Sequence, residues 1–146
     1  MTLARLTGAI LFVAAAIGSS AGAAELKVLS VEALKPALQE LAAAFEADSK
    51  HKLNIEYGTP EVVEKKVAGD DDYDVVIIDK PRMDKLTRAA SVAGGSSQEV
   101  VKHGADTFIA AIPNSAQQAV PAIALIKFLH SPKATEVYKA KGLQPG

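Results

Sequence analysis

Hydrophobic and polar positions along the chain change their period several times, and each change marks the boundary of a predicted element. Residues 26–30 are a short, mostly apolar run that predicts a strand. After it, apolar residues recur at steps of three and four as far as Phe45, which predicts a helix over residues 34–49 with one apolar face. A strand that leads directly into an amphipathic helix is the first half of a β-α-β unit.

The same alternation continues through two more units. Polar and apolar residues alternate over 52–57, which is typical of a strand, and a helix is predicted to follow over 60–69. Thr59 is a suitable N-cap for this helix, and Pro60 suits its first position. The β-branched run over residues 74–79 predicts a strand buried on both faces, with a third helix from Pro81.

The pattern differs in the last third of the chain. Small residues over 90–98 predict a flexible connection, residues 99–103 a short strand or a turn, and residues 107–112 a strand. Two helices are expected to close the fold. The first is predicted over about residues 117–129, or from Val120 if Pro121 delays its start, and the residues expected to face inward are Ala119, Ile123, Ile126 and Leu129. The second is predicted over residues 132–141.

These elements predict the class of fold. Three β-α units in succession indicate a parallel sheet covered by helices on both faces. We therefore expect an α/β fold of three layers (αβα), with parallel strands in the order 2-1-3 and one added antiparallel strand. About 123 residues are enough for one compact domain of this kind.

The first 23 residues have the features of a secretory signal peptide. Arg5 precedes an apolar run over residues 9–17, and small residues then end in an A-x-A pattern at Ala23. An uncleaved membrane anchor is the alternative, but a spanning helix needs about 20 apolar residues and the run is shorter. We expect cleavage after Ala23 and export of residues 24–146 to the periplasm.

Composition excludes several classes of function. The chain has no cysteine, so disulfides, thiolate metal ligands and cysteine nucleophiles are excluded. Its formal net charge is −1 and no basic patch is evident, so nucleic acid is not an expected partner.

Candidate binding residues follow the three parallel strands. Carboxyl ends of parallel strands meet at one edge of a sheet, beside the amino ends of helices that attract anions. The candidates at this edge are Ser30, Glu32, Ala33, Gly58, Thr59 and Asp79. Asp79 either orients a ligand or caps the helix that follows it, and the carboxylates of Glu32 and Glu61 weaken anion binding here.

Other polar groups give no specific chemistry. Asp70, Asp71, Asp72 and Asp74 could bind Ca²⁺, but they lack EF-hand spacing and a solvated loop explains them equally well. The three histidines are far apart in sequence and form no H-x-x-x-H pair. Because no nucleophile and base are paired, we predict neither an enzyme nor a bound metal or cofactor.

Several segments together resemble a known family. AELKVLS, ALKPALQELAAAFE, HKLNIEYGTPE and DYDVVIIDKPRMDKL resemble the first half of the outer lobe of ModA-like periplasmic solute-binding proteins, the molybdate-type binding components of ABC transporters. The stretch AAIPNSAQQAVPAIALIKFLHSPKATEVYKAKGLQP resembles that family's carboxyl-terminal segment. The resemblance covers nearly all of residues 24–145.

The resemblance implies a fold, a ligand and a partner. Family members have the two-lobed type II binding-protein fold, whereas here residues 91–106 stand where the second lobe is expected, so we expect a single lobe. Family contacts to an oxyanion match Ala33 and Thr59-Pro60, although Ala33 has no hydroxyl group and Pro60 has neither hydroxyl nor N–H. The implied partners are a small molybdate-type oxyanion and an ABC permease.

Two alternatives to transport remain open at this point. A lobe without its usual counterpart could form a homodimer, or bind another periplasmic protein, through the face left by the missing lobe. The chain could also be a truncated relative without a transport ligand.

Overall fold

The computed structural model describes residues 23–146, and the predicted signal peptide lies almost entirely outside these residues. Within this part of the chain, none of the helices combines the length and the apolar character that crossing a membrane requires. The elements, in chain order, are β1 (Glu25–Val31), η1 (Glu32–Leu34), α1 (Lys35–Ser49), β2 (Lys52–Gly58), α2 (Pro60–Ala68), β3 (Val75–Asp79), α3 (Lys80–Arg88), β4 (Gln98–His103), β5 (Asp106–Ala111), α4 (Ala119–Phe128), α5 (Pro132–Ala140) and β6 (Gln144–Pro145).

One six-stranded sheet, in the order β2-β1-β3-β5-β4-β6, organises the domain. β1 pairs in parallel with β2 and β3, which confirms the predicted order 2-1-3. β5 is antiparallel to β3, β4 to β5, and β6 to β4. The antiparallel part therefore has three strands instead of the one expected, because β4 forms a full strand and the two-residue β6 is too short to show a periodic pattern.

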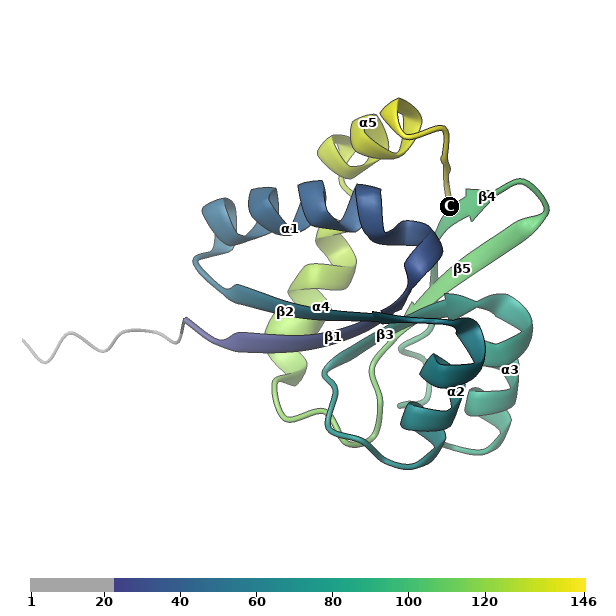
Figure 1. The fold of residues 1–146 in the computed structure, drawn as a ribbon. Helices are drawn as coiled ribbons and strands as arrows, with labels where there is room; N and C mark the ends of the chain where they lie inside the picture. The colour runs from purple at the N-terminus through teal and green to yellow at the C-terminus, as the bar shows by residue number, and fades with distance from the viewer. Residues whose placement is uncertain (1–22) are drawn as a thin grey trace, which may run out of the picture.

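Helices cover both faces of the sheet, as the three-layer prediction requires (Figure 1). α1, α4 and α5 lie on one face, where the rings of Phe45 in α1 and Phe128 in α4 have centroids 5.4 Å apart. α2 and α3 lie on the other face.

Burial explains the patterns of the central and edge strands. The first four residues of β3 are all buried because helices cover both sides of this central strand. β2 lies at the sheet edge and keeps the alternation of exposed and half-buried residues seen in its sequence.

The starts of α2 and α5 each have a side-chain N-cap. Thr59 Oγ1 accepts a hydrogen bond from the Val62 N–H at 3.4 Å, which confirms it as the N-cap of α2. Ser131 Oγ accepts from the Ala134 N–H at 3.2 Å at the start of α5. Each of these two helices has a proline in its first positions.

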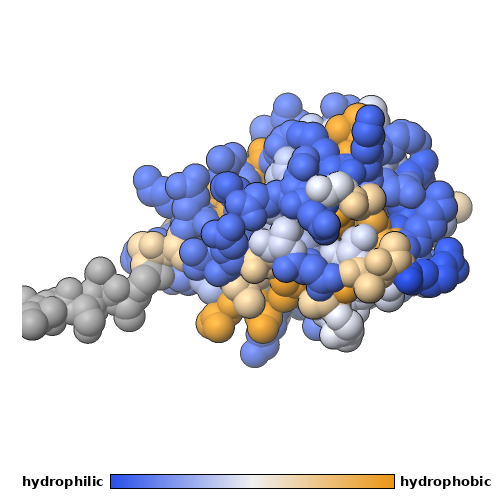
Figure 2. Space-filling model, turned by 90° about the horizontal axis from the view of Figure 1, so that it is seen from below, coloured by the Kyte–Doolittle hydropathy of each residue, from blue (hydrophilic) through white to orange (hydrophobic). Residues whose placement is uncertain are grey.

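The predicted inward face of α4 was partly wrong. Ala119 and Ile123 are exposed, Ile123 by 51%, while Ala122, Leu125 and Ile126 are buried. The helix has apolar residues on all sides, so its sequence does not indicate which side faces the sheet. Val120 is also 79% exposed, and Figure 2 shows hydrophobic residues gathered along one edge of a largely hydrophilic face.

The connection predicted after residue 90 is more ordered than expected. Ala93 N–H donates to Ile112 O at 2.7 Å, and Val92 and Pro113 form an isolated bridge. β4 then joins β5 through the two residues Gly104 and Ala105, with Gly104 at a φ of +60°. A β-hairpin therefore occupies much of the segment expected to replace a second lobe.

Candidate functional site

An open hollow of about 780 Å³ lies at the carboxyl ends of the three parallel strands. Its wall is formed by the turns that follow β1, β2 and β3, by the first residues of α3, by Ala105 in the β4–β5 turn, and by the first residues of β5. We call this feature the hollow. It is at the sheet edge where the sequence predicts a ligand.

Five of the six predicted binding residues line the hollow: Glu32, Ala33, Gly58, Thr59 and Asp79. The structure places the sixth, Ser30, elsewhere. β1 continues to Val31, so Ser30 lies inside the sheet opposite Tyr57 and Ile77 and is fully buried. Its hydroxyl donates to Val31 O at 3.2 Å and does not reach the hollow.

The amino end of α2 has its first donors in use. Pro60 has no N–H, and the Val62 N–H donates to Thr59 Oγ1. The pKa of Glu61 is lowered chiefly because its carboxylate accepts a hydrogen bond from its own backbone N–H, with nearby Arg82 adding to the effect. This helix end therefore has few donors left for an anion.

The amino end of α3 is also capped by a carboxylate. Asp79 Oδ2 accepts from the Arg82 N–H at 3.3 Å, so the capping role of Asp79 is confirmed. Pro81 offers no N–H. In contrast, no side chain caps η1, whose residues Glu32 and Ala33 line the hollow.

Arg82 is the functional residue that the sequence analysis missed. Its Nη1 lies 3.2 Å from Asp79 Oδ1 and its Nε lies 3.2 Å from Glu64 Oε2, in an ion pair without hydrogen-bond geometry. Its Nη2 bonds to Glu61. Burial alone would lower the pKa of Arg82, but the surrounding carboxylates, Asp79 foremost, raise it overall.

A sequence signal for this arrangement existed. Glu61 and Glu64 are three residues apart on α2, and Arg82 follows Asp79 by three residues on α3. Residues at this spacing lie on the same side of a helix. The two helices follow β2 and β3, the parallel strands on either side of β1, and lie on the same face of the sheet. The signal depends on knowing that α2 and α3 are neighbours, which the alternation alone does not show.

Negative charge exceeds positive charge in the wall of the hollow. Four carboxylates line it, from Glu32, Asp79, Asp84 and Asp106, against two cations, Lys80 and Arg82. Both cations are already paired, because Lys80 Nζ lies 3.0 Å from Asp84 Oδ2. The geometry offers an oxyanion few free donors and no free cation.

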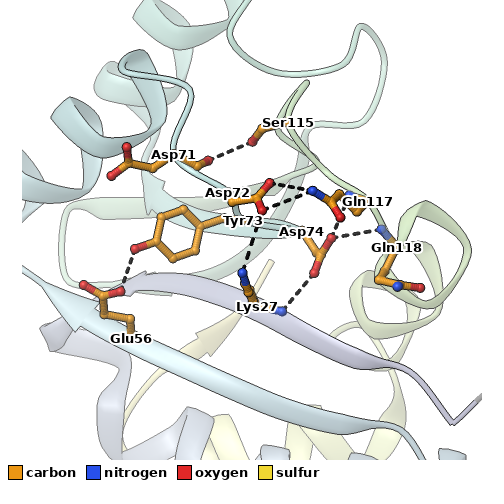
Figure 3. A network of polar contacts seen from close by, with 9 residues as sticks. All are labelled: Lys27, Glu56, Asp71, Asp72, Tyr73, Asp74, Ser115, Gln117 and Gln118. Carbon is orange, nitrogen blue, oxygen red and sulfur yellow. Dashed lines mark hydrogen bonds and ion pairs between the residues drawn. The ribbon is translucent and has the colours of Figure 1, made fainter.

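The acidic run before β3 contributes no residue to the wall of the hollow. Figure 3 shows the polar contacts of this run. Asp74 Oδ2 accepts from the Lys27 N–H, and its Oδ1 accepts from the N–H groups of Gln117 and Gln118, all at 2.9 Å. Asp72 accepts from Gln117 Nε2 at 3.1 Å. These two carboxylates join the start of the sheet to the loop before α4. Among residues 23–146, no three or more histidine or carboxylate side chains are grouped in a way that could hold a metal ion.

A sequence comparison identifies the family. The family described as "Bacterial extracellular solute-binding protein" matches residues 26–106, which is more than half of the chain. The chain belongs to this family of bacterial extracellular solute-binding proteins. No curated protein is significantly similar to the whole sequence.

Solved structures agree on the fold. One neighbour of this solute-binding protein is the substrate binding domain of a protein described as a molybdenum ABC transporter from Clostridium difficile, with a TM-score of 0.77, 11% identity, and coverage of 84% of this chain and 99% of that one. Another is the periplasmic molybdate-binding protein of Azotobacter vinelandii, with a TM-score of 0.77 and 13% identity. The match covers 83% of this chain and 99% of that one. At such low identity the likeness establishes the ModA-like fold alone.

Proposed function

We propose that this protein is the solute-binding component of an ABC transporter and binds a small solute in the hollow. The observation that carries the proposal is the convergence of five predicted binding residues, from turns after three different strands, on one open site. Family membership and the two structural neighbours named for molybdenum or molybdate support it. We assign no enzymatic reaction to the site.

The ligand we propose is a small oxyanion of the molybdate type, bound weakly. The uncapped amino end of η1 offers backbone N–H groups at Glu32 and Ala33. The excess of carboxylates and the pairing of Lys80 and Arg82 oppose tight binding. An open hollow also buries less of a ligand than an enclosed pocket does.

Isothermal titration of residues 24–146 with molybdate, tungstate and sulfate tests this function. We expect weak but measurable heat for at least one of the three anions. Ala33→Glu should abolish the heat, because it adds a carboxylate where the anion would bind. Ala140→Glu, an equal change at an exposed site on α5, should leave it unchanged. Absence of heat with all three anions would remove the oxyanion assignment.

We also propose that residues 1–23 direct export and that residues 24–146 act as a single periplasmic lobe without a second one. The extracellular description of the family supports the first part. The two-residue turn between β4 and β5, within the segment where the second lobe is expected, supports the other part. Amino-terminal sequencing of protein recovered from the periplasm should begin at Ala24, and a start at Met1 would contradict cleavage.

A second candidate function is protein interaction through the same face. The use of the first α2 and α3 donors within their own helices favours this alternative. Light scattering separates the two functions. A stable dimer that binds no oxyanion supports an interaction module, and a monomer that binds one supports transport.

A further inference from the structure

Arg82 carries the only guanidinium group among the residues that line the hollow. Three carboxylates from two elements surround it: Glu61 and Glu64 on α2, and Asp79 at the end of β3. Each of the three guanidinium nitrogens therefore faces a carboxylate oxygen.

This arrangement is more than a set of surface ion pairs. The side chains of Arg82, Glu64 and Asp79 are 28%, 27% and 13% exposed, so water screens their charges only partly. Glu61 is more open, with 69% of its side chain exposed. Lys85 Nζ also lies 3.5 Å from Glu64 Oε1, so the cluster has three negative and two positive charges and keeps a net negative charge.

A free guanidinium in such a hollow would bind oxyanions well, since its planar fork of N–H donors matches the oxygens of a tetrahedral anion. Here an incoming anion would have to displace a carboxylate from Arg82 and would be repelled by the others. The same residue that could bind the anion is thus kept from it by its neighbours.

We propose that Glu61 and Glu64 act as a charge filter that holds Arg82 and keeps oxyanions from binding tightly in the hollow. The inference rests on the proposed function, because it assigns the specificity of that same site. Asp79 contributes to the filter, but it also caps α3, so its removal would disturb the fold. The two glutamates are the appropriate residues to change.

The test compares the wild-type protein with E61Q/E64Q by titration with molybdate and tungstate at low salt. Glutamine keeps the shape of each side chain and removes its charge. We expect the affinity for oxyanions to rise about tenfold, and the gain to shrink as salt is added. Adding Arg82→Gln to the double variant should abolish the gain, because the released guanidinium is its source.

A matched control is E40Q/E136Q, which removes two exposed charges on α1 and α5 outside the wall of the hollow. An equal gain in this control, or no gain in E61Q/E64Q with the fold intact by circular dichroism, would overturn the charge filter. So would a gain that persists after Arg82→Gln.

The outcomes also separate this inference from the proposed function. If the wild type binds and E61Q/E64Q binds equally, the filter is wrong and the oxyanion assignment stands. If the wild type shows no oxyanion binding and E61Q/E64Q binds, the charge filter is supported and an oxyanion is not the natural ligand. If neither binds, both are wrong.

Discussion

At the scale of single residues, Asp74 and Asp79 lie at opposite ends of β3, and their carboxylates have different structural roles. Asp74 is only 5% exposed and accepts three backbone hydrogen bonds that join β1 to the loop before α4. Asp79 caps α3 and pairs with Arg82 in the hollow. Both carboxylates are fully used within the protein, so their acidity alone does not indicate a ligand site.

Replacing Asp74 should be costly. Asp74→Ala leaves three backbone donors without their acceptor, and we expect the free energy of unfolding to fall by about 2 to 3 kcal/mol. Asp72→Ala is the comparison, because its contacts with Lys27 at 3.7 Å and with Gln117 Nε2 at 3.1 Å are both exposed to water and should together contribute less than about 1 kcal/mol. Urea denaturation at neutral pH measures both values, and equal losses would contradict the structural role of Asp74.

Glu56 predicts a pH dependence. Its pKa is lowered, first by a hydrogen bond from Lys66 and next by one from Tyr73, whose hydroxyl lies 2.6 Å from Oε2. A lowered carboxylate pKa means that the native state favours the charged form, so this contribution is present at neutral pH and lost as the pH falls.

The measurement is the stability of Glu56→Gln relative to the wild type. Because half of the Glu56 side chain is exposed, we expect a loss below about 1 kcal/mol at pH 7. The difference should shrink as the pH falls below the ordinary glutamate pKa of about 4.3, and should vanish only when the pH has passed the lowered pKa of Glu56. Glu136→Gln, at an exposed position on α5, should show no such trend. A difference that grows on acidification would refute the assignment.

At the scale of elements, the side of a helix that faces the core depends on the packing around the helix as well as on its sequence. α1 has a polar side and an apolar side, and the predicted apolar face, which extends to Phe45, is buried. α4 is apolar nearly all round, and packing against the sheet selected Leu125 and Ile126 while leaving Ile123 outside. Pattern alone is informative only where the two sides of a helix differ.

Substitutions of two isoleucines on α4 test which side of this helix faces the core. Ile126→Ala should lower the free energy of unfolding by about 2 to 4 kcal/mol, because it opens a cavity in the core. Ile123→Ala should change it by less than about 0.5 kcal/mol, since the side chain is half exposed and alanine favours the helix. Thermal or urea unfolding distinguishes them, and a larger effect at Ile123 would mean that the helix is rotated.

At the scale of the whole molecule, one hydrophobic core joins elements from β1 to the residues after α5. It includes Leu26 near the start of the described chain and Leu143 near its end. The final segment returns to the sheet through β6, which pairs with β4. Within residues 23–146, a single core therefore connects the first strand to the last.

This continuity predicts a single cooperative unfolding transition for residues 24–146. Far-ultraviolet circular dichroism follows the helices, while the near-ultraviolet signal of tyrosine follows packing around Tyr138 on α5, which is 2% exposed. The two signals should give the same midpoint in urea. Separate midpoints would indicate two independently stable parts.

Much of the site could be predicted because it follows from topology. Three parallel strands bring their following turns to one edge, so Glu32, Ala33, Gly58, Thr59 and Asp79 meet in the hollow as expected. Ser30 was placed there because β1 was predicted to end at Ser30, whereas it ends one residue later, at Val31. Arg82 was missed because its partners Glu61 and Glu64 lie on another helix, about twenty residues away in sequence.

The sequence by itself determined the elements whose signals are local: the three β-α units, their proline-containing helix starts, and the parallel direction of strands that are joined through helices. Only the tertiary structure decided the side of α4 that faces the core, the addition of β6 to the sheet, and the enclosure of Arg82 by three carboxylates. The physical reason is that hydrophobic periodicity indicates which residues of a single segment are buried and which are exposed. The features decided by the tertiary structure depend instead on contacts between segments that are distant in sequence.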